Sequence, residues 1–116
     1  MTTSDSKIAD YYRMNLGYLS VLALQISQVP SELGDHSQSV HLELLRTEPL
    51  RKVTVRFSAV VQLKIADLHP GTKCLLQIKS TADAQMENIR YRIFNGEQDL
   101  TLSFYCLDFE VVEQEL

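Results

Sequence analysis

The feature that most constrains the fold is a long alternation of apolar and polar residues in the middle of the chain. Every odd position from Val53 to Ile65 is apolar, and Val60 is the only apolar residue at the even positions between them. Successive side chains of a strand point to opposite faces of a sheet. The pattern therefore predicts a strand, or a bent pair of strands, with the odd positions buried and the even positions in solvent. A sheet with one solvated face is typical of antiparallel architecture.

Shorter segments with the same period of two surround this strand. They begin near Val40, Cys74, Ile89 and Leu100. The sequence His69-Pro70-Gly71-Thr72 favours a turn, and Asn95-Gly96 is a favoured hairpin turn between the last two segments. After Cys106 the apolar phase slips by one residue, which predicts a bulge near Leu107-Asp108.

The first 30 residues follow a different period. From Ile8 to about Val29, apolar residues recur at steps of three and four, which indicates a helix. Asp5 or Ser6 can cap its start, Pro30 ends it, and Gly17 is the point at which it could break. Leu22, Leu24 and Ile26 also fit strand alternation, so a helix followed by a strand stays open.

These patterns together predict an α+β fold. An N-terminal helix packs on an antiparallel sheet of about five strands. A length of 116 residues, 45% of them hydrophobic, suits one domain covering residues 1–116.

Composition and motifs argue against several function classes. The net charge of −4, with no clustered Lys and Arg, predicts neither a nucleic-acid nor a membrane partner. The basic residues Lys52, Arg56 and Lys64 are interpreted as a solvated sheet face. The N-terminus lacks the pattern of a signal peptide, which favours a cytoplasmic protein. The four glycines stand apart, so no phosphate loop is formed, and we predict no cofactor.

No catalytic or metal motif is evident. Cys74 and Cys106 lie in apolar segments, where buried free thiols are favoured over a disulfide or a reactive nucleophile. The three histidines, His36, His41 and His69, do not have the spacing of metal ligands. We therefore predict no metal site and no catalytic residue, although partners that meet only in space remain open.

Two groups of residues are candidates for contact with a partner protein. The first comprises four loop acids: Asp83, Glu87, Glu97 and Asp99. They are either ordinary solubilising residues or an acidic patch that meets a basic partner. The second comprises Tyr11, Tyr12 and Tyr18, which are either interface anchors or residues that pack the helix on the sheet.

The layout of residues 40–113 resembles small bacterial immunity proteins of polymorphic toxin systems, whose members often end on a similar strand of aromatic residues and cysteine. The segments that carry the resemblance are Val53-Thr54-Val55-Arg56-Phe57, Leu63-Lys64-Ile65-Ala66-Asp67-Leu68, Ile89-Arg90-Tyr91-Arg92-Ile93 and Leu102-Ser103-Phe104-Tyr105-Cys106. The resemblance implies a non-enzymatic cytoplasmic protein that binds a cognate toxin and blocks it. It assigns no functional residue.

Two alternatives to an immunity protein remain. One is a scaffold or oligomerisation module that uses a sheet edge or a helix face. The other is an enzyme whose site is assembled in space from residues far apart in the sequence.

Overall fold

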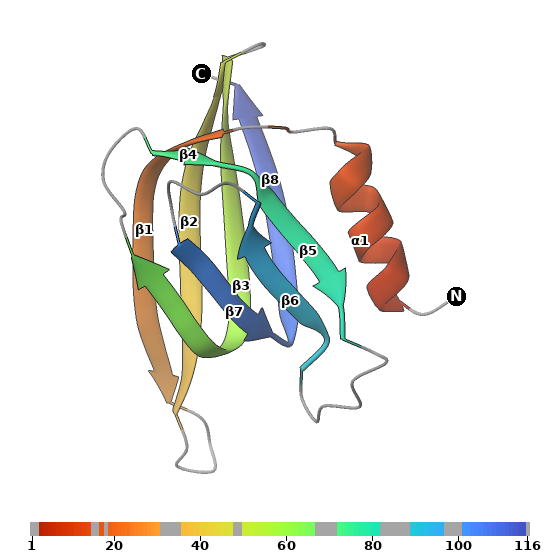
Figure 1. Ribbon diagram of the computed structural model, residues 1–116, viewed down its shortest axis with the longest axis vertical. Coiled ribbons are helices and arrows are strands. Elements are labelled where there is room, and N and C mark those ends of the chain that lie inside the picture. The colour runs from red at the N-terminus through yellow and green to blue at the C-terminus, as the bar shows by residue number, and fades with distance from the viewer. Residues whose placement is uncertain are drawn as a thin grey trace.

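The protein is almost entirely antiparallel sheet (Figure 1). The computed structural model describes residues 3–14, 17, 19–30, 36–47, 50–66, 72–81, 89–96 and 101–115. Its elements are α1 (Thr3–Arg13), β1 (Leu19–Pro30), β2 (His36–Thr47), β3 (Leu50–Ala66), β4 (Lys73–Cys74), β5 (Leu76–Ser80), β6 (Tyr91–Asn95), β7 (Thr101–Cys106) and β8 (Asp108–Glu115).

The strands form one strongly bent sheet in the order β4-β1-β2-β3-β7-β6-β5, with β8 also paired to β3. Only Leu75 separates β4 from β5, yet β4 pairs with β1 and β5 pairs with β6. The two ends of the strand order are therefore joined by one short segment of chain. The sheet curls back on itself, and β3 forms the hinge between its two halves.

Two irregularities in β3 produce this bend. Ala59 and Gln62 have positive φ angles of 53° and 54°. Each lies where the register shifts, the first against β2 and the second against β7. An extra residue reverses the face to which the following side chains point.

Because of these two irregularities, which are β-bulges, the burial of β3 differs from the prediction. Val53, Val55 and Phe57 are buried as expected. After the first bulge, however, Val60 is buried and Val61 is exposed, contrary to the prediction. After the second bulge the phase returns, and Leu63 and Ile65 pack against the core. The alternation of apolar and polar residues is continuous in the sequence, but the extended backbone is interrupted at Ala59 and Gln62.

The last strands run along the whole of β3. β7 pairs with its second half and β8 with its first half, so residues 101–115 form an antiparallel partner with a bend at Leu107. The break in phase thus falls where it was predicted. The predicted pairing of β6 with β7 is also found, with Ile93 opposite Phe104. The predicted tight turn at Asn95-Gly96 is not, because Asn95 still lies in β6 opposite Leu76.

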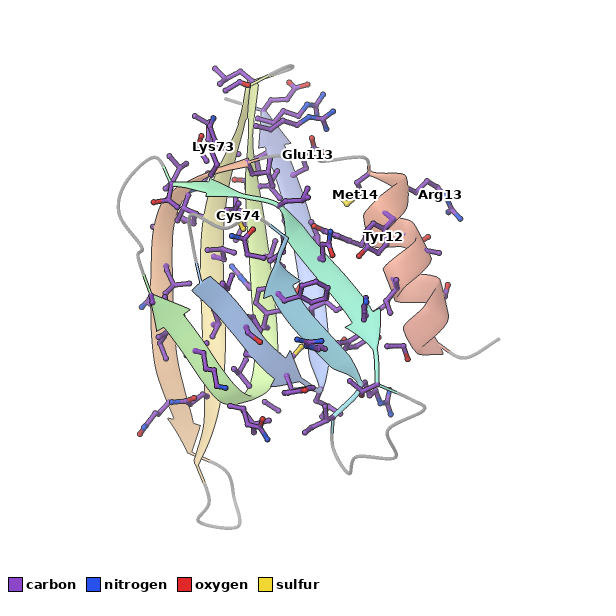
Figure 2. The ribbon with its side chains drawn as sticks, viewed as in Figure 1. Tyr12, Arg13, Met14, Lys73, Cys74 and Glu113 are labelled. Carbon is purple, nitrogen blue, oxygen red and sulfur yellow. The ribbon has the colours of Figure 1, made fainter. Side chains whose placement is uncertain are left out.

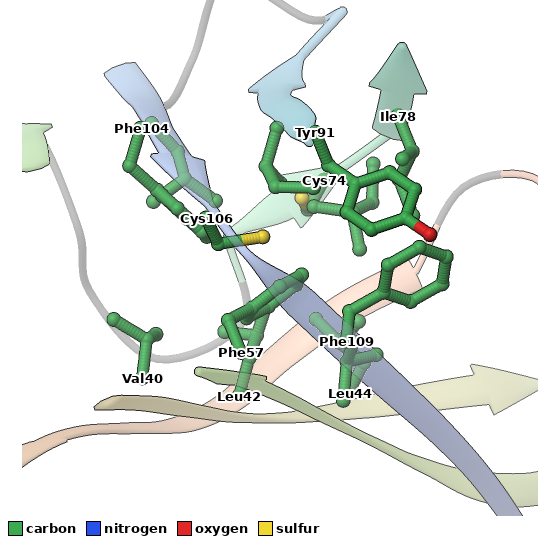
Figure 3. Packing of buried hydrophobic residues seen from close by; sticks show 14 of the residues in the cluster. Val40, Leu42, Leu44, Phe57, Cys74, Ile78, Tyr91, Phe104, Cys106 and Phe109 are labelled. Atoms are coloured by element: carbon green, nitrogen blue, oxygen red, sulfur yellow. The ribbon is translucent and has the colours of Figure 1, made fainter. Parts of the chain in front are cut away.

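The core lies between the two halves of the bent sheet (Figure 3). Phe57 of β3 meets Phe104 of β7 edge-to-face, with ring centroids 4.8 Å apart, and Tyr91 meets Phe109 in the same geometry at 4.8 Å. Each such pair contributes about 0.5–1.5 kcal/mol of stability in addition to the contribution of the buried area. Because the rings come from β3, β6, β7 and β8, this core holds both halves of the sheet together.

The predicted α+β fold, with a helix packed on about five strands, is wrong. Eight strands and one short helix make up the part of the chain that the structure describes. Residues 8–29 do not form one helix but the end of a helix followed by a strand, the alternative that the sequence left open. α1 ends at Arg13, Gly17 has a φ of +66°, and β1 pairs with β2 along its length. Helical spacing was overridden by tertiary structure, because β1 pairs its backbone with β2 and buries Leu19 and Val21 in the core.

Candidate partner-binding surface

The four predicted partner-binding acids lie outside the described residues. They are Asp83, Glu87, Glu97 and Asp99. Their role therefore stays a prediction, and the described surface has to be considered on its own geometry.

The two described tyrosines of α1 attach the helix to the edge of the sheet. The Tyr11 hydroxyl donates to the Leu76 carbonyl at 2.5 Å, and burial raises the pKa of Tyr11 well above its usual range. Tyr12 lies on the side of α1 that faces β5, where its hydroxyl both donates to the Ile78 carbonyl and accepts from the Ile78 N–H, each at 3.0 Å (Figure 2). These contacts favour the packing role over the role of interface anchors. Tyr18 lies outside the described residues.

The two cysteines are free, buried and held in their unreactive protonated form. Cys74 and Cys106 are both fully covered in the core. Desolvation by burial raises the pKa of each thiol to about 12. The prediction of buried free thiols is confirmed, and neither group has the exposed electropositive setting of a nucleophile.

Metal-ligating side chains do not gather within the described ranges. No group of three or more His, Cys, Asp or Glu residues there is placed to hold an ion. His41 lies on the outer side of β2, with its ring 3.9 Å from the Glu43 carboxylate. His36 belongs to β2 but its side chain is not described, and His69 lies outside the described residues.

The basic residues of β3 behave as a solvated face. Lys52 pairs with Glu43 at 3.1 Å, whereas Arg56 and Lys64 are exposed. Arg56 lies before the two bulges and Lys64 after them. The two therefore belong to different halves of the bent sheet and form no continuous basic stripe.

A groove runs between α1 and β8. Its hollow of about 230 Å³ is lined by Lys7, Asp10, Tyr11, Met14, Phe109, Glu110 and Val111. Lys7 crosses one end: its ammonium donates to the Asp108 carboxylate and, at 2.8 Å, to the Phe109 carbonyl. The same ammonium lies 5.4 Å from the centroid of the Phe109 ring, a cation–π contact.

The other end of β8 carries a small ion network. The Glu113 carboxylate lies 3.3 Å from the Arg46 guanidinium and 3.8 Å from that of Arg51, which also contacts Glu115 at 3.5 Å. Glu113 is one-fifth exposed, so this carboxylate is partly shielded from solvent. These contacts fix the end of β8 against β2 and β3.

Sequence reasoning missed this groove. Its two walls are 101 residues apart at the Lys7–Asp108 contact. No local pattern reports such a distance. The one available signal was the composition of residues 108–115, Asp-Phe-Glu-Val-Val-Glu-Gln-Glu, which has four acids and no basic residue.

The fold is thus a strongly bent antiparallel sheet, with a helix and a groove at one of its edges. A family model for immunity protein PIM8 matches residues 3–112, and the chain belongs to this family of immunity proteins. No curated protein and no solved structure matches the chain. None of the helices that the structure describes is long and apolar enough to cross a membrane.

Proposed function

We propose that this protein neutralises a cognate bacterial toxin by binding to it in the cytoplasm. The observation that carries the proposal is membership of the immunity protein family over residues 3–112. An immunity protein protects its own cell by occupying the toxin, so the function requires a stable recognition surface and no chemistry of its own.

Binding without catalysis agrees with the state of the described nucleophiles. Both thiols are buried, and their raised pKa keeps them protonated at neutral pH. The hydroxyls of Tyr11 and Tyr12 are engaged with the backbone of β5. These groups stabilise the fold, which is the task expected of a rigid inhibitor.

The loop acids Asp83, Glu87, Glu97 and Asp99 belong to this proposal as residues that attract a basic toxin. Charges at the rim of an interface act mainly on the rate of association. The double variant Glu97→Lys/Asp99→Lys should therefore slow association, and the slowing should shrink as salt is raised. An association rate unchanged at low salt would remove this loop from the binding surface.

The proposal is tested by co-expression with a candidate toxin, sought first among the genes that neighbour this one. Cells that express the toxin alone should stop growing, and cells that also express this protein should grow. Phe57→Ala, which disrupts the core, serves as the control that should lose protection. Failure of the wild-type protein to protect, with both proteins present at normal levels, would contradict the immunity function and favour a scaffold.

A further inference from the structure

β8 is an edge strand whose outer side carries no strand. It pairs with β3 from Asp108 to Glu115, and no other described strand pairs with it. An unpaired edge presents backbone N–H and C=O groups that can pair with another chain. Proteins commonly block such edges, so an open one needs an explanation.

Three hydrogen bonds establish which residues of β8 face this edge. The Ser58 carbonyl of β3 accepts a hydrogen bond from the Leu107 N–H. The backbone groups of Ser58 therefore point toward β7 and β8. The Phe109 N–H donates to the Asp108 carboxylate, and the Phe109 carbonyl accepts from Lys7. Phe109 therefore turns its backbone groups away from β3.

Alternation along an antiparallel strand extends this assignment. Backbone groups point to one side at every second residue. Because Phe109 faces outward, Val111, Glu113 and Glu115 also direct their N–H and C=O groups to the free edge, while Glu110, Val112 and Gln114 bond to β3. Lys7 and Asp108 cover the edge at Phe109, and from Val111 onward no strand in the described part of the chain pairs with it.

The groove beside this edge offers an apolar wall. Tyr11 and Met14 of α1 and Val111 of β8 line it, and Met14 and Val111 are only partly buried. Figure 2 shows Met14 at the end of α1. On the opposite side of β8, Val112 is 37% exposed and lies next to Glu110. An added strand would thus meet apolar side chains on one face and a mixed acidic and apolar surface on the other.

The charge of β8 selects the occupant. Four residues of β8 are acidic and none is basic. Asp108 is already paired with Lys7, and Glu113 and Glu115 are paired with arginines of β2 and β3. A second copy of β8 would bring no basic side chain to Glu110, because this strand has none. Glu110 is exposed and, among the described residues, forms no ion pair, so it is available to a basic side chain.

We propose that the free edge of β8 from Val111 to Glu115 accepts an extended segment of the toxin, with alternating apolar and basic side chains, as an added strand between β8 and α1. The inference rests on the proposed function and deepens it, because it names the surface and the chemistry of the segment. Main-chain hydrogen bonds hold the strand, and the groove and Glu110 select its side chains.

The first test needs no toxin. The full-length protein is titrated with the blocked peptides KVKVKVKV, EVEVEVEV and DFEVVEQE while its backbone amides are followed by NMR and hydrogen exchange. The basic peptide should shift and protect the amides of Val111, Glu113 and Glu115 and leave the already protected amides of Val112 and Gln114 unchanged. Equal response to the acidic peptide, or a stronger response to the peptide of β8 itself, overturns the proposed occupant.

Two proline variants test the edge itself. Val111→Pro removes an N–H that faces the groove, so the variant should fold and bind the basic peptide about tenfold more weakly. Val112→Pro removes an N–H that bonds to β3 and should lower the stability of the whole protein. If Val111→Pro unfolds instead, Glu110→Lys gives the second test. This variant should bind the basic peptide more weakly and the acidic peptide more tightly than the wild-type protein does.

The same variants separate this inference from the proposed function. If wild-type protein protects cells against the toxin and folded Val111→Pro protects equally well, the edge is not the binding surface, although the immunity function stands. If wild-type protein gives no protection, the immunity function fails and toxin docking on β8 fails with it, whatever the peptides show.

Discussion

Removal of the Phe57 side chain tests whether the core lies between the two halves of the bent sheet. Phe57 is 0% exposed, lies at the centre of β3 and meets Phe104 edge-to-face at 4.8 Å. Phe57→Ala removes this contact and leaves a cavity, at an expected cost of about 3–5 kcal/mol. Arg56, its neighbour, is exposed and should lose at most about 0.5 kcal/mol on truncation to Ala.

The assay is equilibrium urea unfolding followed by far-UV circular dichroism. Since domains of this size are stable by only about 5–15 kcal/mol, Phe57→Ala can be largely unfolded in water. Phe57→Leu keeps much of the volume but loses the aromatic contact with Phe104, so it should cost about 1–1.5 kcal/mol, which keeps the measurement possible. Equal losses for Arg56→Ala and Phe57→Leu would show that the buried face of β3 has been assigned wrongly.

Two further predictions concern the thiols and the bulges. Cys74 and Cys106 should react slowly with a thiol reagent in the native protein. After denaturation, two thiols per chain should react. Because burial raises each pKa from 9.0 to about 12, the folded state favours the protonated thiol. Stability should therefore fall as pH rises from about 9 to 12, and less so in the Cys74→Ala/Cys106→Ala variant; a fast-reacting native thiol would contradict the burial. Gln62→Gly relieves a positive φ and should raise stability by about 0.5–1 kcal/mol, whereas Gln25→Gly in β1 should lower it by a similar amount; urea midpoints that fall equally would count against the bulge.

The sequence by itself determined the strand character and the apolar face of several segments, but not of residues 19–30 or of β3 beyond its first bulge. The alternation from Val53 to Phe57, the apolar positions of β7 and the change of phase at Leu107 all correspond to the structure. These features are local, because the period of side chains along a strand depends only on backbone geometry. The free, buried state of both cysteines could be predicted for the same reason, since each lies in an apolar segment.

The tertiary structure decided the extent of β1, the bulges of β3 and the groove. Residues 19–30 satisfy both helical and strand spacing, and pairing with β2 selects the strand. The positive φ angles at Ala59 and Gln62 arise where β3 passes from one half of the sheet to the other. The residue types at these two positions do not predict them. The groove between α1 and β8 is formed by two segments that are far apart in the sequence, in contact at Lys7 and Asp108. Such features depend on contacts between distant segments, and a pattern that extends over a few neighbours carries no information about them.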